Sequence, residues 1–356
     1  MQAQMLFWLG FLVIYGIAFF IDMFVTKHRM KDLTIKSALR WSILWISIAM
    51  LYGLAILFYY PQNPDTTVST SSIVAMKYFS GYFTEYSLSI DNLFVFIMIF
   101  SLMGVAERSQ PRLLKLGILL SIVLRIMFII AGMHLLEQFH FVIYFFGAIL
   151  LWTAYKMAFT NHDEKIDPRH NLLYKAASRL LPLDPDPHAP HFFRKHDGKL
   201  FITNVLLVFL VIGSTDVLFA LDSIPAIFGV IKDGTGGLLT LGDEHFIAVT
   251  SNTFAVMGLV SLYFALKGII KLFRFLKHGV SFILFFIGAK MILTASKPVE
   301  EFFHVRPWIT LTVIVSTLAV SVLVSVLLEE KVEVQEELET VRHQLEELRD
   351  EEAHTK

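Results

Sequence analysis

The sequence predicts an all-α polytopic membrane protein with about nine transmembrane helices, a 3+3 inverted repeat and a charged helical C-terminal tail. Hydrophobic residues make up 55% of the 356-residue chain, Phe alone contributes 33 and the mean hydropathy is +0.63. These values are typical of membrane proteins rather than soluble ones. A polar pattern occurs twice inside the apolar stretches, which indicates a repeat. The chain has no cysteine, which excludes disulfides, thiol redox chemistry and thiolate metal sites.

Nine apolar windows are long enough to cross a bilayer, which takes about 20 residues. The first window is too long for a signal peptide, and it lacks a small-residue cleavage site. The windows lie near Met5–Val25, Trp41–Tyr60, Ile73–Met103, Leu113–Met133, Phe141–Phe159, Leu200–Ile231, Phe246–Leu266, Val280–Thr294 and Trp308–Leu328.

Lysine and arginine gather in alternate loops, and such loops face the cytoplasm. The basic loops are 27–40, 108–115, 156–199 and 267–277. This alternation requires an odd number of spans and places the N-terminus outside and the C-terminus in the cytoplasm. We therefore expect a multi-pass protein of the cell (inner, cytoplasmic) membrane, with the lipid bilayer as its surroundings and no nucleic-acid partner.

The predicted spans divide the chain into six segments. Residues 1–60 hold two N-terminal transmembrane helices, and residues 61–160 and 200–296 hold three helices each as repeats 1 and 2. Residues 161–199 form a cytoplasmic loop rich in His and Pro, 297–328 the last transmembrane helix, and 329–356 an acidic cytoplasmic tail. The loop is interpreted as a Pro-stiffened connector, since its histidines form no compact ligand pattern; a metal-capture loop is the alternative.

The tail carries eleven acidic and four basic residues from Glu329 onward. Its apolar residues follow a 4-3-4-3 spacing over about two heptads. A solvated helix is the first interpretation, and a seam for a homo-oligomer or a cytoplasmic partner is the second. The spaced residues are Val334, Leu338, Val341, Leu345 and Leu348.

The duplicated pattern is Thr84-Glu85, five residues, Asp91-Asn92, and then Thr215-Asp216, five residues, Asp222-Ser223. Downstream, Lys156-Met157 recurs as Lys290-Met291 at a similar offset. Because each copy begins a unit of three spans, which is an odd number, the second copy must be inverted, as in many secondary transporters with a site near the midplane. The length of the first acidic span, with Gly81, Ser87 and Ser89 in it and Gly213 and Pro225 in the second, predicts breaks in both helices.

Four carboxylates in the membrane predict a bound cation. Each charge costs about 2.5–3.5 kcal/mol at the bilayer centre, so they need a partner. Carboxylate, amide and hydroxyl oxygens suit a hard divalent ion: manganese, with calcium or magnesium as alternatives. This ion would be cargo, with no permanent cofactor. The predicted metal ligands are Glu85, Asp91, Asn92, Asp216, Asp222 and Ser223, and further transport-path candidates are Thr84, Thr215, Arg125, Asn252 and Pro225.

Two of these candidates carry open alternatives. Arg125 is either a partner that balances the excess carboxylate charge or a packing residue near the end of its span. Asn252 either lines the ion path or caps the start of the seventh span, and the sequence does not choose between the two.

The segments Glu85–Phe96 and Ser214–Phe228 resemble the two signatures of the TerC family of integral membrane proteins. The similarity extends through Leu124-Arg125, Phe146–Ala148, Thr250–Asn252 and Gly288–Met291 and covers roughly residues 73–328. The resemblance implies kinship with LysE-type transporters, whose members are linked to manganese export or named for tellurium resistance or alkaline stress. It also implies that the four carboxylates form the transport site. Val260 stands where family sequences often carry Arg.

The favoured function is therefore a secondary transporter that exports a divalent metal cation, with manganese as the favoured ion, in metal ion homeostasis. The alternative is a membrane scaffold or stress factor, associated with tellurite resistance or with redox and alkaline stress, that transports nothing. An enzyme is not expected, because the chain has no Cys, no buried His pair and no nucleotide-binding loop.

Overall fold

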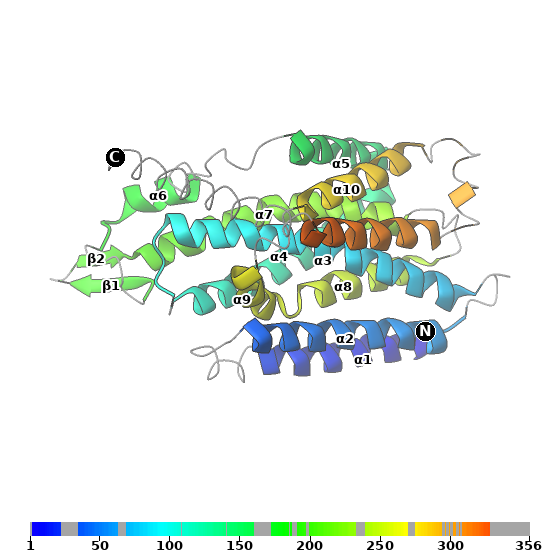
Figure 1. Ribbon diagram of the computed structural model, residues 1–356, viewed down its shortest axis with the longest axis horizontal. Helices are drawn as coiled ribbons and strands as arrows, with labels where there is room; N and C mark the ends of the chain where they lie inside the picture. Colours follow the sequence, from blue (N-terminus) through cyan, green and yellow to red (C-terminus); the bar gives the residue numbers. More distant parts are fainter. Residues whose placement is uncertain are drawn as a thin grey trace, which may run out of the picture.

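The protein is a bundle of membrane helices with one small hairpin (Figure 1). The computed structural model describes residues 2–22, 35–62, 69–107, 109–139, 141–159, 172–184, 186, 191–196, 199–232, 239–269, 275–293, 296, 299, 302–303, 306 and 308–327. The side chains of a few helical residues within these ranges, Asp91 and Asp222 among them, lie outside the described part.

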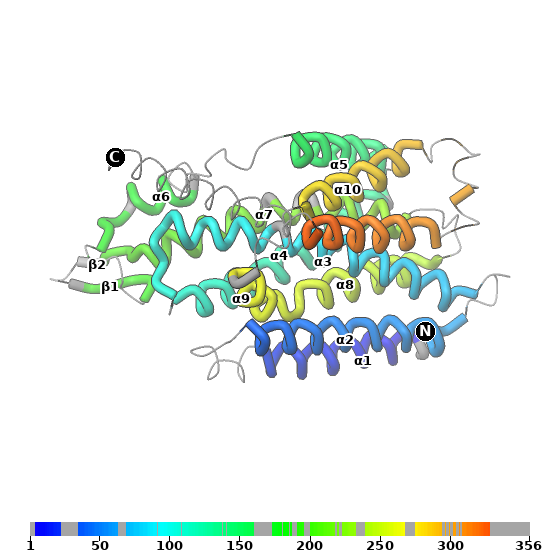
Figure 2. Tube along the Cα trace, in the orientation of Figure 1, coloured from blue at the N-terminus to red at the C-terminus, as the bar shows by residue number. Residues whose placement is uncertain are grey.

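The elements follow one another along the chain in an order that Figure 2 traces by colour. The first five helices are α1 Gln2–Phe20, α2 Ile35–Tyr59, α3 Thr70–Leu102, α4 Gln110–Gln138 and α5 Val142–Phe159. The connector contains α6 Leu172–Leu180 and the strands β1 Phe193–His196 and β2 Lys199–Ile202. The second part contains α7 Asn204–Ile231, α8 Leu241–Val256, α9 Leu259–Ile269, α10 Leu276–Leu293 and an unlabelled helix, Trp308–Leu327.

Each of the nine predicted windows coincides with a helix or a helix pair. Six of the described helices are long and apolar enough to cross a membrane, and a seventh span results if the bent pair α8 and α9 counts as one. Helix α1 and the described apolar part of α7 are shorter than this test requires. A multi-pass helical membrane protein is therefore confirmed, whereas nine spans stay a prediction.

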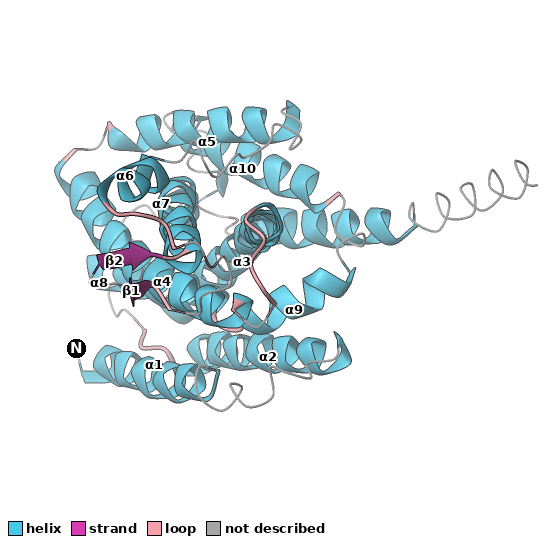
Figure 3. Ribbon diagram, turned by 90° about the vertical axis from the view of Figure 1, so that its left-hand side faces the viewer, coloured by secondary structure: helices cyan, strands magenta, loops and turns pink. Residues whose placement is uncertain are grey.

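Helix α3 lies near the middle of the bundle, where the view along the long axis shows it end-on (Figure 3). Helices α1 and α2 cover one side, and α5 and α10 cover the opposite side. Large apolar side chains of α1 and α2 are exposed, Leu6 and Phe58 among them. In a membrane protein such side chains face lipid, so the core of the bundle and its outer surface are both apolar.

The predicted breaks in the two acidic helices are wrong. Helix α3 runs without interruption for 33 residues and α7 for 28, with Pro225 inside α7. One physical reason is that an unwound turn in the membrane needs new partners for its backbone groups. The small polar residues at the expected breaks are instead satisfied within the helix: Ser87 Oγ donates to the carbonyl of Thr84 at 2.7 Å.

The break lies in the seventh span instead. Helices α8 and α9 meet at an angle of 40° across Met257 and Gly258. Gly258 has a φ of +83°, a left-handed conformation that glycine adopts without the penalty of a side chain. A Cβ atom there would lie 2.5 Å from Cδ1 of Trp45 on α2, so glycine also permits the close approach of α2.

The two predicted repeats make reciprocal contacts. Helix α3 packs on α8 as α7 packs on α4, and α5 packs on α10. Gly147 lies against Gly288, and Ser281 Oγ donates to the carbonyl of Ala154 at 2.7 Å. Under the offset of 134 residues that relates Lys156 to Lys290, these two contacts are the same contact with its partners exchanged. Between the two contacts the residue numbers rise along α5 and fall along α10, so these two helices are antiparallel. Such exchange is what an inverted repeat would produce, and the inversion itself stays a prediction.

Gly288→Ala is expected to lower the free energy of unfolding by about 1–3 kcal/mol, the usual cost of overpacking. The added Cβ would lie 2.9 Å from Leu150 Cβ and 3.0 Å from the Gly147 carbonyl oxygen, which belongs to the backbone and has little room to move. The measurement is thermal unfolding of purified protein in detergent. Gly16→Ala on α1 is the matched control, because nothing lies within 4 Å of its Cβ position. Equal unfolding temperatures for the two variants would contradict the packing argument.

The connector is more ordered than a plain linker. Strands β1 and β2 pair antiparallel, and Phe192 packs on Phe209 of α7 with ring centroids 5.4 Å apart. Thr203 then caps α7 by accepting a hydrogen bond from the amide of Leu206. The hairpin is a small exception to the all-α prediction. Residues 161–171 and 329–356 lie outside the described part, so the structure tests neither the metal-capture interpretation nor the helical tail.

Candidate functional site

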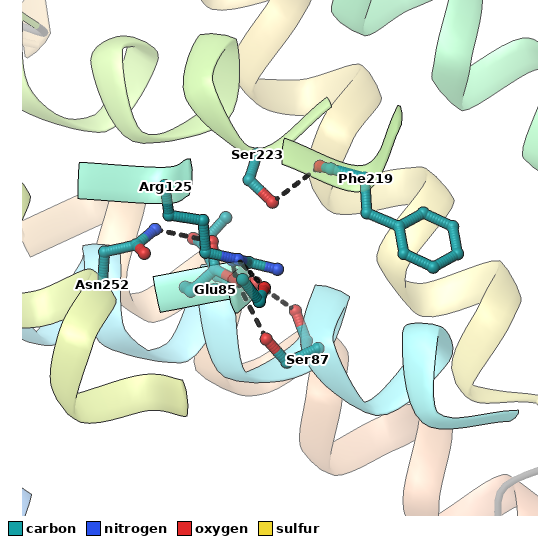
Figure 4. A network of polar contacts seen from close by, with 9 residues as sticks. Glu85, Ser87, Arg125, Phe219, Ser223 and Asn252 are labelled. Atoms are coloured by element: carbon teal, nitrogen blue, oxygen red, sulfur yellow. Dashed lines mark hydrogen bonds and ion pairs between the residues drawn. The ribbon is translucent and has the colours of Figure 1, made fainter. Parts of the chain in front are cut away.

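A buried carboxylate, that of Glu85, is the centre of a polar cluster between α3, α4 and α8 (Figure 4). Its Oε1 accepts a hydrogen bond from Ser89 Oγ at 2.9 Å and forms an ion pair with Nη1 of Arg125. Its Oε2 accepts a hydrogen bond from Nδ2 of Asn252 at 2.8 Å. Both oxygens of the Glu85 side chain therefore have protein partners.

The helices bring these residues together through close packing of small side chains. A Cβ at Gly81, one turn before Glu85 on α3, would lie 2.7 Å from Ser251 Oγ on α8. This near-contact holds α8 close enough to α3 for Asn252, the next residue, to reach Glu85. The Ser251 hydroxyl donates back to the carbonyl of Ile247 at 2.7 Å and needs no partner on α3.

Arg125 enters the cluster from α4 and is 3% exposed. Its Nε donates to Ser121 Oγ at 3.2 Å, one turn earlier on the same helix. Its guanidinium also interacts electrostatically with the carboxylate of Asp216 on α7. Of the two sequence interpretations of Arg125, the structure favours the carboxylate partner, because the side chain pairs with Glu85 instead of packing near a span end.

Asp216 on α7 is a second buried carboxylate, and it interacts electrostatically with Arg125. It is 3% exposed, and its Oδ2 has no hydrogen-bond partner among the described residues. Thr84 Oγ1, next to Glu85, is a second buried oxygen without a partner in that part of the chain. Buried polar atoms are nearly always hydrogen-bonded, so an acceptor without a partner in a polar cluster is a candidate contact for a ligand.

The other predicted residues lie on the same helices but outside this contact network. Thr215 donates to the carbonyl of Val211 at 2.8 Å and Ser223 to that of Phe219 at 3.1 Å. Asn92 is buried on α3, and Pro225 is buried in α7.

The remaining two predicted ligands, Asp91 and Asp222, have side chains outside the described part, although their backbones are helical. On a continuous helix each lies about 9 Å along the axis and about 120° around it from the acidic residue six positions before. Within the described residues no group of three or more Asp, Glu or His could hold a metal. The four-carboxylate site is therefore untested.

The sequence analysis did not assign Ser89, Ser121 or Gly81 to the site, although it named Ser89 and Gly81 as points at which α3 would break. A usable signal was present for the two serines, because each lies four residues from its partner and therefore on the same helix face. No comparable signal pointed to Gly81, since its role depends on the approach of another helix.

Helices and cluster together define a multi-pass integral membrane protein with an ion pair buried between its helices. Residues 70–333 match the family described as "Integral membrane protein TerC family". The chain belongs to the TerC family.

Relatives of known name are similar over most of their length. One is a protein of Escherichia coli strain K12 named "Putative membrane-bound redox modulator Alx", 34% identical over 321 residues, which are 90% of this chain and 94% of that protein. Another is the "Thylakoid membrane protein TERC, chloroplastic" of Arabidopsis thaliana, 36% identical over 253 residues, 70% of this chain and 61% of that protein. A membrane protein of Myxococcus xanthus, STKORF319, is 34% identical over 320 residues, 90% of this chain and 92% of its own. No solved structure matches the chain significantly.

Proposed function

We propose that the protein is a secondary transporter that moves a divalent metal cation through the membrane. The observation that carries the proposal is the buried ion pair between Glu85 and Arg125, whose guanidinium also interacts electrostatically with the buried Asp216 of the other predicted repeat. Buried charges are costly in a membrane protein and are typical of ion pathways. Since one carboxylate comes from each predicted repeat, movement of the repeats would open the cluster to alternate sides.

Manganese is the favoured cargo, with calcium and magnesium as alternatives. The side chains of the cluster include carboxylate, amide and hydroxyl groups, whose oxygen atoms are the ligands that hard divalent ions prefer. The resemblance to TerC sequences favours manganese and the export direction. Under this proposal Asp91, Asn92, Asp222 and Ser223 complete the ion path, in the cytoplasmic membrane with the C-terminus inside.

The test is manganese flux in proteoliposomes containing the purified full-length protein, measured with and without a pH gradient. We expect flux above that of protein-free liposomes, and a response to the gradient would identify protons as the coupled ion. Calcium and magnesium are measured under the same conditions. Absence of flux for all three ions, from protein shown to be folded and inserted, would contradict the proposal.

A second candidate is a membrane factor that acts through soluble partners without transport. The name of the Escherichia coli relative refers to redox modulation, and the charged tail of this chain offers a docking segment. Any redox role of this chain would proceed without a thiol of its own, because the sequence contains no cysteine.

Deletion of Glu333–Lys356 distinguishes the two candidates. The deleted segment follows the last described helix in the sequence, and every described residue of the cluster around Glu85 precedes it. We therefore expect manganese flux within about twofold of the full chain, measured in the same liposomes at equal protein incorporation. If flux is absent from the full chain and the cellular phenotype depends on the tail, the second candidate replaces the first.

A further inference from the structure

Glu85 has no free side-chain oxygen in this structure. Ser89 and Arg125 engage Oε1, and Asn252 engages Oε2. All three provide N–H or O–H donors, and a metal ion cannot share the same lone pair with a hydrogen-bond donor. A carboxylate has about four lone-pair positions, so these three donors leave about one for a metal ion, and the like charge of the guanidinium makes Arg125 the donor that an entering cation would repel most strongly.

Arg125 has a second carboxylate within electrostatic reach. The guanidinium has five N–H groups, of which Nε is used by Ser121 and Nη1 pairs with Glu85. Asp216 interacts with the same guanidinium, and its Oδ2 is buried without a hydrogen-bond partner among the described residues. Arg125 thus pairs with an acidic residue of the first predicted repeat and interacts electrostatically with one of the second, and it is attached to α4, which packs on α7 and α8.

We propose that Arg125 is a tethered substitute for the transported cation: it neutralises Glu85 and Asp216 when the site is empty, and an entering divalent ion displaces it. This inference rests on the proposed transport function and adds how the empty carrier returns. Two unpaired carboxylates buried between helices would be strongly unfavourable, so an empty site without its own cation could not easily change sides. With Arg125 the empty protein can change sides, and net transport becomes feasible.

The proposal separates two activities that a structural role would not separate. Net flux of manganese requires the empty carrier to return, whereas exchange of manganese across the membrane requires only the loaded carrier to move. Arg125→Gln removes the competing cation. We expect the dissociation constant for manganese to fall by about tenfold, net flux to fall by about tenfold, and exchange to stay within about threefold of wild type.

The experiment uses proteoliposomes of the full chain with manganese as the probe ion. Net uptake is measured into metal-free liposomes, exchange by uptake of radioactive manganese into liposomes preloaded with manganese, and affinity by titration of the purified protein. Equal loss of net flux and exchange in Arg125→Gln, or weaker binding, overturns the role of Arg125 while wild-type flux still supports a transporter. Absence of wild-type binding and flux instead overturns the proposed function and this inference together.

A second variant guards against misfolding, because Arg125→Gln leaves Glu85 without its counter-ion. Arg125→Lys keeps the positive charge and loses the planar fork of donors. Because the charge is what substitutes for the metal, we expect the ratio of net flux to exchange to stay within about threefold of wild type. A ratio about tenfold lower in a folded Arg125→Lys protein also overturns the proposal.

Discussion

Asp216→Asn is expected to reduce manganese flux by about 100-fold or more while the protein stays folded. Changes to groups that only orient a metal ligand typically cost 10–100-fold, so loss of a proposed ligand charge should cost at least as much. The fold should tolerate the change, since Asp216 Oδ2 has no hydrogen-bond partner within the described residues. Flux in proteoliposomes and thermal unfolding in detergent are the two measurements.

The control for this change is Asp186→Asn, which removes the same charge from an exposed carboxylate on the connector. It should leave both flux and unfolding temperature unchanged. Glu85→Gln makes a useful contrast, because it breaks the buried ion pair with Arg125 and should lower stability as well as flux. Normal flux in Asp216→Asn would remove Asp216 from the ion path and weaken the case for a site shared by the two predicted repeats.

Gly258→Ala is expected to lower the free energy of unfolding by about 2–5 kcal/mol. The left-handed backbone costs a non-glycine residue about 1–2 kcal/mol, and forcing a methyl group into a packed contact costs about 1–3 kcal/mol more. Both conditions hold here, because φ is +83° and the new Cβ would lie 2.5 Å from Trp45 Cδ1 and 2.8 Å from Cγ. Thermal unfolding followed by intrinsic tryptophan fluorescence measures the loss.

Gly104→Ala separates the two contributions. Gly104 also has a positive φ, +59°, but nothing lies within 4 Å of its Cβ position. It should therefore show the backbone cost alone and unfold at a higher temperature than Gly258→Ala. If the two variants unfold at the same temperature, the contact between Gly258 and Trp45 is not what holds α2 against the bend.

The positions of the helices could be predicted because bilayer thickness fixes the length of an apolar segment. The duplicated acidic pattern likewise led to Glu85, which is paired with Arg125 in the buried cluster, and to Asp216, which is buried and interacts electrostatically with the same guanidinium. The sequence could not show which side chains from other helices these two carboxylates contact. Asn252 is 167 residues from Glu85, and their hydrogen bond depends on how closely α3 approaches α8.

Residue types alone also could not predict that the two acidic helices are continuous. Gly81, Ser87 and Pro225 are residues at which membrane helices do break, and the sequence prediction placed breaks there. In the folded protein Gly81 serves helix contact and the Ser87 hydroxyl bonds its own helix. The break occurs at Gly258, in a span with no duplicated motif to draw attention to it.

The glycine contact between α5 and α10 constrains how the two halves of the protein can move. At Gly147 and Gly288 the two backbones are too close for even a methyl group, so the helices cannot slide past each other there without meeting the bulky side chains on either side. The hydrogen bond from Ser281 Oγ to the carbonyl of Ala154 joins the same two helices about two turns away. Because α5 and α10 are held at two levels, we expect any movement of one predicted repeat against the other to carry this helix pair as one rigid body.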